Sequence, residues 1–170
     1  YLSRISVNDR DTETAADLAQ RKGYNDYSVE AVNFIKQNDK SFYRIDKAYS
    51  SSPAMHLSIN DGMAQDYHGT SEYSPFNQQY YIFYLQLMTI AKKDDEINSR
   101  WAVGLTARPL LESENQVKYL LAKKEYNPVW RGAGDSIAHF GDVTVLRNQM
   151  FLPMGYTYDH YIKESVFDRL

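Results

Sequence analysis

The strongest apolar pattern in the chain lies within residues 67–93, where a polar, glycine-containing loop is followed by the most apolar segment of the sequence. Ser74 and Pro75 form a helix-start signal, because a serine oxygen caps free backbone N–H groups and proline at the first helical position loses no needed donor. Beyond them, apolar residues recur at helical spacing, at Phe76, Tyr80, Phe83, Tyr84, Leu87 and Ala91. The pattern predicts a helix over about residues 75–92. Further apolar side chains around it indicate a central helix that is buried on several sides.

Shorter patterns precede this helix. Residues 11–22 form a helix candidate that Asp11 or Thr12 would cap and Gly23 would end. Residues 28–37 form a second candidate with apolar side chains at helical spacing. Residues 41–48 have a strand-like composition, and residues 55–59 alternate apolar and polar side chains, as in a half-buried strand.

Strand patterns dominate the second half of the chain. A short apolar segment at 101–105 and a single helical turn at 109–114 come before two predicted strands, at 117–122 and 126–131. Gly141 and Asp142 separate two further apolar runs, which is typical of a β-hairpin with a glycine-first turn. A last helix is expected to begin near residue 165. This order predicts an α+β fold, with helices mainly in the first half around the central helix and an antiparallel sheet mainly in the second.

Composition narrows the class of protein. A chain of 170 residues fits a single domain, 1–170, with its own core. The formal net charge of −3 gives no support for nucleic-acid binding, and the absence of cysteine excludes disulfides and thiolate chemistry. No apolar run reaches the roughly 20 residues that cross a bilayer. Because the chain starts at Tyr1 rather than methionine, we expect it to be a fragment of a longer protein.

The chemistry-bearing residues form no catalytic motif. The four histidines are scattered and no compact metal-ligand pattern is present, so no metal site and no cofactor are predicted. No serine lies on a nucleophile elbow. Asp61, Asp66 and Glu72 could supply a carboxylate pair for glycoside hydrolysis, although loop carboxylates are common. Tyr67 and Tyr73 either stack on sugar rings or belong to a tyrosine-rich edge of the core.

Four segments, in this order, resemble the extracytoplasmic domain of YfhO-family bacterial membrane proteins. They are FYRIDK at 42–47, SINDGMAQDYHGTSEYSPFNQQYY at 58–81, QVKYLLAK at 116–123 and FGDVTVLRNQMFLPMGYTYDHYI at 140–162. The resemblance covers about three quarters of the chain. It implies a polytopic plasma-membrane protein similar to GT-C-type glycosyltransferases, which use lipid-linked sugars outside the membrane and are implicated in glycosylating polymers such as lipoteichoic acid.

The resemblance also implies where catalysis takes place. In such enzymes the catalytic carboxylate is expected in a loop near the first transmembrane helices, outside this chain. We therefore expect an accessory extracytoplasmic domain, with the membrane-embedded remainder and either an envelope polysaccharide or a polyprenyl-phosphate sugar as partners. The alternatives are a non-enzymatic carbohydrate-binding or scaffolding module of the envelope and a soluble hydrolase.

The loop at 67–74 is the expected binding site. Tyr67 and Tyr73 would offer stacking faces, and His68, Thr70 and Glu72 would offer hydrogen bonds to hydroxyl groups. Arg44 would pair with an internal carboxylate or with a phosphate of an anionic polymer.

Overall fold

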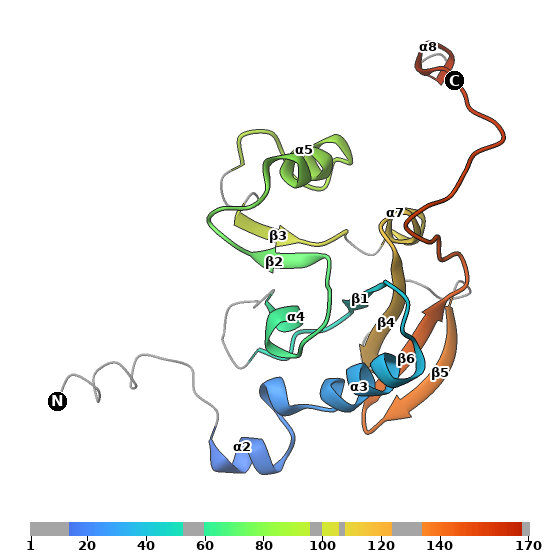
Figure 1. Ribbon diagram of the computed structural model, residues 1–170. Helices are drawn as coiled ribbons and strands as arrows, with labels where there is room; N and C mark the ends of the chain where they lie inside the picture. Colours follow the sequence, from blue (N-terminus) through green and yellow to red (C-terminus); the bar gives the residue numbers. More distant parts are fainter. Residues whose placement is uncertain (1–13, 53–59, 96–99, 106–107, 124–133, 168–170) are drawn as a thin grey trace.

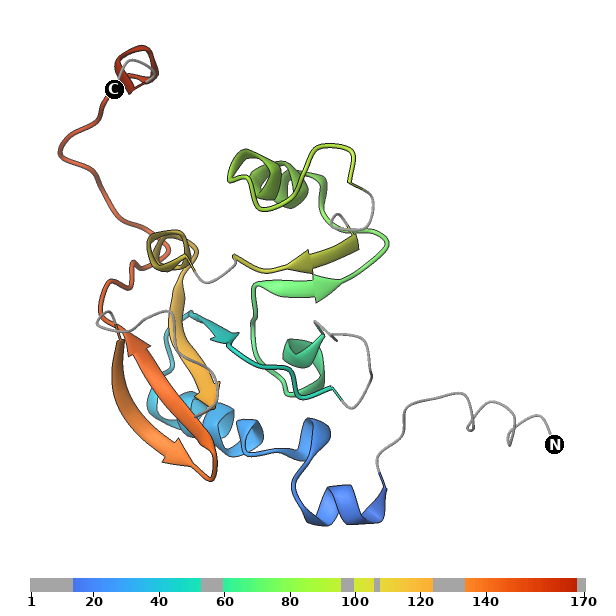
Figure 2. The same ribbon diagram turned by 180° about the vertical axis from the view of Figure 1, so that it is seen from behind.

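The computed structural model describes residues 14–52, 60–95, 100–105, 108–123 and 134–167. In chain order the elements are α2 (Ala15–Ala19), the 3₁₀ turn η1 (Gly23–Asn25), α3 (Ser28–Asn38), β1 (Arg44–Lys47), α4 (Asp61–Ala64), β2 (Ser71–Tyr73), α5 (Gln79–Leu87), β3 (Trp101–Val103), α7 (Pro109–Glu114), β4 (Val117–Lys123), β5 (Gly134–Phe140), β6 (Val143–Asn148) and α8 (Glu164–Phe167). Figure 1 shows their arrangement, and Figure 2 gives the view from behind. The predicted α+β class is confirmed. The strands predicted at 55–59 and 126–131 lie outside the described residues.

The larger sheet has the strand order β1-β4-β6-β5. Strands β4, β6 and β5 pair antiparallel, as predicted for the second half, whereas β1 joins β4 in parallel. The β5–β6 hairpin turns at Gly141, whose φ of +55° suits glycine. A Cβ at that position would also lie 2.2 Å from the Tyr27 ring, so the hairpin docks closely on the start of α3.

The sheet is covered on both faces, and β4 shows this most clearly. Tyr119 and Leu121 of β4 join a core cluster with Val32 and Ile35 of α3. The alternating residue Leu120 points to a second cluster that includes residues of α5, β3 and α7. Because side chains alternate along a strand, consecutive buried residues indicate burial on both faces. Strand β4 is therefore the buried centre of the molecule.

Helix α5 corrects the prediction of a long, buried central helix. It spans only Gln79–Leu87, and Leu85 is its one buried residue. Ser74 does not cap it, because the Ser74 Oγ accepts from Phe76 N at 3.1 Å, ahead of the helix. The Ser74 N–H donates to Arg100 O at 3.1 Å and extends the β2–β3 ribbon. The side chain of Gln78 caps the helix instead, accepting from Tyr81 N at 2.7 Å.

The helix ends earlier than predicted because residue 89 adopts a left-handed backbone conformation. Thr89 has a φ of +57°, and the Ile90 N–H reaches back to Leu85 O at 2.8 Å. This is the geometry of a helix that closes on a left-handed residue. Four of the six residues on the predicted apolar face are exposed, so the helix is not buried on several sides; they are Phe76, Tyr80, Phe83 and Leu87.

The shorter predicted helices are mostly confirmed. Helix α3 and helix α7 have nearly the predicted bounds, and α8 begins close to the expected residue. Helix α2 lies inside the range predicted at 11–22, where its cap is Thr14, in a capping box with Asp17. The segment predicted as a loop at 67–74 contains a short strand, β2, which pairs with β3.

Candidate functional site

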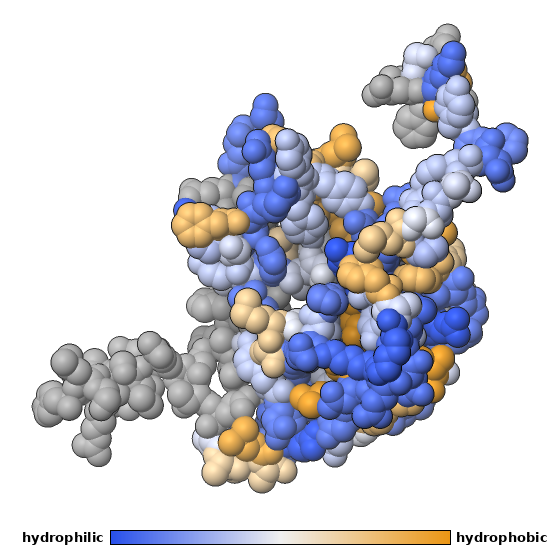
Figure 3. Space-filling view, in the orientation of Figure 1, coloured by the Kyte–Doolittle hydropathy of each residue, from blue (hydrophilic) through white to orange (hydrophobic). Residues whose placement is uncertain are grey.

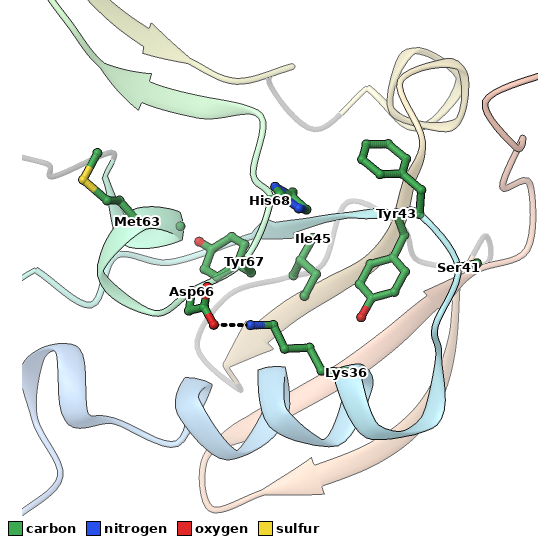
Figure 4. Close-up of a pocket in the computed structure, with 10 residues that line it drawn as sticks. Lys36, Ser41, Tyr43, Ile45, Met63, Asp66, Tyr67 and His68 are labelled. Carbon is green, nitrogen blue, oxygen red and sulfur yellow. Dashed lines mark hydrogen bonds and ion pairs between the residues drawn. The ribbon is translucent and has the colours of Figure 1, made fainter.

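A groove runs between the segment that leads into β1 and the segment that joins α4 to β2. Its larger part is a cavity of about 490 Å³, and the adjoining part holds about 330 Å³. Both parts share Phe42, Gly62, Met63, Tyr67 and His68 as lining residues. Figure 4 shows Tyr43, Tyr67 and His68 around the larger part, with α3 below it. The groove thus has an aromatic wall contributed by two segments that lie apart in the sequence.

Helix α4 forms one side of the groove, and a buried ion pair holds it in place. Lys47 Nζ contacts Asp61 Oδ2 at 2.6 Å and Gln65 Oε1 at 2.8 Å, at the two ends of the helix. Gln65 in turn donates to Asp26 Oδ1 at 3.1 Å. Burial lowers the pKa of Lys47, and the charge of Asp61 opposes that effect. Since α4 has only one turn, these side-chain contacts fix its position.

A close backbone approach then shapes the turn after α4. The Tyr67 N–H donates to Gly62 O at 2.9 Å, and a Cβ at residue 62 would lie 2.9 Å from Tyr67 O. Asp66, with a φ of +57°, reverses the chain. His68 O then accepts from Ile45 N at 2.8 Å, so the segment is tied to β1. Gly62 is therefore needed for the tight packing that brings Tyr67 and His68 to the groove.

The exposed aromatic surface of the groove is a stack of three side chains. The rings of Phe42 and His68 lie 5.9 Å apart between centroids, at 33°. The Arg44 guanidinium carbon lies 5.3 Å from the centroid of the Phe42 ring, within the range of a cation–π contact. Phe42 and His68 are both exposed, so part of each ring is accessible to a ligand.

Arg44 is held at one end of the groove by neutral acceptors. Its Nη1 donates to Asn115 O at 3.2 Å and to Gln116 Oε1 at 3.1 Å. None of the ion pairs among the described residues involves Arg44. The exposed side chain of Glu72 lines the same part of the groove as Arg44.

An exposed ion pair marks the other end. Lys36 of α3 reaches Asp66 at 2.5 Å, as the dashed line in Figure 4 shows. The hydrogen bond from Lys36 keeps the pKa of Asp66 below its usual value. Because both groups face solvent, this pair adds little stability. Both remain accessible to polar groups of a ligand.

The structure divides the six predicted site residues into two groups. Arg44, Tyr67, His68 and Glu72 line the groove together. Tyr67 also packs on the core cluster beneath α3, and burial strongly raises the pKa of its hydroxyl group. Thr70 and Tyr73 do not line the groove. Thr70 accepts a hydrogen bond from Tyr81 through its carbonyl oxygen, and the Tyr73 ring packs at a tilt against Trp101 with centroids 4.6 Å apart.

The sequence analysis missed Phe42, Met63 and Lys36. The first of these had a usable signal, because Phe42 and Arg44 are two residues apart next to a strand and side chains at that spacing share a face. Met63 is 83% exposed on a single helical turn, and Lys36 comes from a helix 30 residues before Asp66. Neither of these two residues carries a sequence pattern that points to the groove.

The three candidate carboxylates are placed in different environments. Asp61 is buried against Lys47, Asp66 is exposed and pairs with Lys36, and Glu72 is exposed on β2. Within the part of the chain that the structure describes, no group of three or more histidine, aspartate or glutamate side chains is arranged to hold a metal ion.

Comparisons with known proteins identify the family. The chain matches the family described as bacterial membrane protein YfhO over residues 3–170, which extends the resemblance to the N-terminal residues as well. No curated protein and no solved structure matches the chain. Among the described residues, no helix has both the length and the apolar character needed to cross a membrane. The match nevertheless covers nearly the whole sequence, and the chain therefore belongs to the YfhO family of bacterial membrane proteins.

Proposed function

We propose that this chain is an accessory, non-catalytic domain of a membrane glycosyltransferase and faces the outside of the bacterial plasma membrane. In this proposal the groove holds a cell-envelope polymer of the lipoteichoic acid type. The membrane-embedded remainder of the protein takes a sugar from a polyprenyl-phosphate donor and supplies the catalytic carboxylate. Membership of a membrane-protein family supports the setting, and the groove supports the contact with a polymer.

The observation that carries the proposal is the stack of Arg44, Phe42 and His68 in an open groove. Sugar rings have apolar faces that pack on aromatic side chains, and their hydroxyl groups need hydrogen-bonding partners at the edges. The stack offers the faces, and Glu72 offers an acceptor. A guanidinium that forms no ion pair with the described residues suits the phosphate groups of an anionic polymer.

A second candidate is a carbohydrate-binding or scaffolding module that takes no part in sugar transfer. Asp61 is buried, which favours a non-hydrolytic role for this chain. The accessory domain and the carbohydrate-binding module both have such a role. They differ in what the groove does for the whole protein. Sugar transfer by the full-length protein in membrane preparations distinguishes them, because only an accessory domain of the transferase changes the rate when its groove is altered.

Binding to purified lipoteichoic acid tests the groove itself. We expect the double variant Phe42→Ala, His68→Ala to bind about tenfold more weakly in titration calorimetry, because it loses the stacking surface. Ile137→Ala is the matched control, because Ile137 is 41% exposed, close to the 42% of Phe42, and lies on β5 away from the groove. Equal affinities of the double variant and the control would contradict the proposal.

A further inference from the structure

The outward face of α5 exposes a stripe of large apolar side chains. Tyr80 is 75% exposed, Phe83 52% and Leu87 76%, and Phe76, just before the helix, is 91% exposed. None of the four belongs to the two core clusters. The opposite side of α5 packs inward through Leu85, Tyr81 and Ile82. Helix α5 therefore has two apolar sides, and only the inner one is covered.

The C-terminal segment lies at the same end of the molecule. Figures 1 and 2 both show α5 and α8 at the upper end, away from α2 and α3. In this segment Tyr158 is exposed, as are Tyr161 and Ile162. In Figure 3, orange apolar atoms appear on the surface of this upper end, whereas the surface over α3 is mainly blue. Several exposed apolar side chains thus lie at this end of the domain.

We propose that the outward face of α5 rests on a lipid bilayer, with its rings in the interfacial layer. Tyrosine and phenylalanine are the side chains that favour this layer, and a helix that lies in it buries one apolar face. The family is a family of membrane proteins, so a bilayer is close to this chain. Exposed Lys92 and Lys93, shortly after α5, extend long side chains toward lipid phosphates. Asp94 follows them, so the apolar rings supply the main attraction.

The size of the stripe favours a bilayer over a second copy of the chain. A stable dimer buries roughly 800 Å² on each partner, drawn from 20–30 residues. The stripe offers four side chains on and beside a nine-residue helix. A bilayer, in contrast, accepts a convex stripe without needing a complementary surface. The proposal does not depend on polymer binding, because α4 and β1, which flank the groove, lie across β2 and β3 from α5 in Figure 1.

Site-specific labelling tests the proposal directly, because the chain contains no cysteine. A polarity-sensitive fluorophore on Tyr80→Cys reports on α5, and the same label on Ile137→Cys of β5 is the control. The probe is a vesicle of phosphatidylglycerol and phosphatidylethanolamine, with and without brominated acyl chains. We expect a blue shift and bromine quenching for the label at residue 80, and neither for the label at residue 137. A label at residue 80 that stays in water in the presence of vesicles would overturn the proposal.

Affinity for the same vesicles gives a second, independent readout. We expect the triple variant Phe76→Ser, Tyr80→Ser, Leu87→Ser to sediment with vesicles at least about tenfold more weakly, because it loses interfacial apolar area. Its matched control is Leu18→Ser, Ile137→Ser, Met150→Ser, which removes three exposed apolar side chains elsewhere. The single variant Tyr80→Ser should show a smaller loss in the same direction if the triple variant does not fold. An equal loss of vesicle binding by the control would refute the assignment. Dimerisation that covers α5 in the absence of vesicles would refute it as well.

Discussion

Two neighbouring residues of the groove, Tyr67 and His68, lie in opposite environments. Tyr67 packs on the core cluster beneath α3, next to Gly62 and Gly69. His68 is exposed and touches the Phe42 ring. Adjacent residues in an extended segment point to opposite sides, so one of the pair stabilises the fold while the other faces a ligand. This separation decides which variants report on binding and which report on folding.

The first prediction concerns that separation. Tyr67→Ala should lower the free energy of unfolding by about 2–4 kcal/mol, because it leaves a cavity beneath the groove. His68→Ala should change it by less than about 0.5 kcal/mol, since its side chain is exposed. Urea denaturation of the two variants measures both values. Similar losses would show that the histidine is also part of the core.

The second prediction concerns two neighbouring acids, the half-buried Asp46 and the buried Glu112. The Asp46 carboxyl group is hydrogen-bonded to Glu112, and burial raises the pKa of Asp46 above its usual value. The folded state therefore holds a proton that the unfolded state releases, so this group's contribution to stability is lost as pH rises from about 4 through the raised pKa. Asp46→Asn needs no such proton. Its stability relative to the unaltered chain should rise between pH 4 and pH 8 in thermal melts, and a constant difference would contradict the raised pKa of Asp46.

Sequence reasoning named part of the groove lining, because charged and polar side chains suggest binding by their residue type alone. Arg44, His68 and Glu72 were found as polar residues near a loop with tyrosines, and the structure brings them to one groove. Phe42 was missed because an exposed aromatic ring looks like a core residue in a sequence. Tyr73 was expected in the site, yet its strand register opposite Trp101 turns it away. Register depends on pairing between segments that are about 30 residues apart, which no local pattern records.

At the scale of elements, the position of α4 depends on side chains more than on its own helix. The helix is one turn long, and Lys47 of β1 contacts both Asp61 and Gln65. The exposed fractions of the two ion-pair side chains are only 4% for Lys47 and 8% for Asp61. Removing one partner of a buried pair leaves an uncompensated charge in the interior. The wall of the groove is therefore linked to the integrity of this pair.

The third prediction tests this link. Lys47→Met should destabilise the protein by about 3–5 kcal/mol, because Asp61 stays buried without its cation. The matched control is Lys36→Met, the same substitution at the exposed pair with Asp66, and should cost less than about 1 kcal/mol. Chemical denaturation measures both. If the two variants lose the same stability, the buried pair does not anchor α4.

Helix α5 shows that its ends and its buried side could not be predicted from the sequence. Its apolar period was read correctly as helical at its centre, but its ends were set by other contacts. Pairing of the β2–β3 ribbon holds Ser74 in extended backbone, and the left-handed Thr89 ends the helix. Tyrosine and phenylalanine at helical spacing are compatible with a core and with an exposed apolar face. The prediction of burial on several sides was therefore wrong, because only the inner side of α5 is covered. By contrast, the β5–β6 hairpin was predicted well because its turn chemistry is local.

At the scale of the whole molecule, the sheet rather than α5 forms the centre. Strand β4 carries buried side chains on both faces, between the cluster beneath α3 and the cluster beside α5. The segments after β6 make the upper end, where α8 stands apart from the sheet in both views. Stability is therefore expected to be highest around β4 and to decrease toward α5 and the C-terminal segment.

The fourth prediction follows from this arrangement. Amide hydrogen exchange should be slowest at residues 117–123, faster across α5 and fastest in α8, because exchange from buried strands requires the largest openings. Mass spectrometry of peptides after deuterium labelling measures the order. Protection of α5 equal to that of β4 would restore the interpretation of α5 as the central helix.

The central claim is that the groove at Phe42 and His68 binds an envelope polymer, and amide chemical-shift mapping tests it most directly. In a titration of the isotope-labelled chain with purified lipoteichoic acid, the account predicts that shifts concentrate at residues 42–44 and 66–72 and leave β5 unchanged. Shifts spread evenly over the surface, or confined to residues away from the groove, would contradict it.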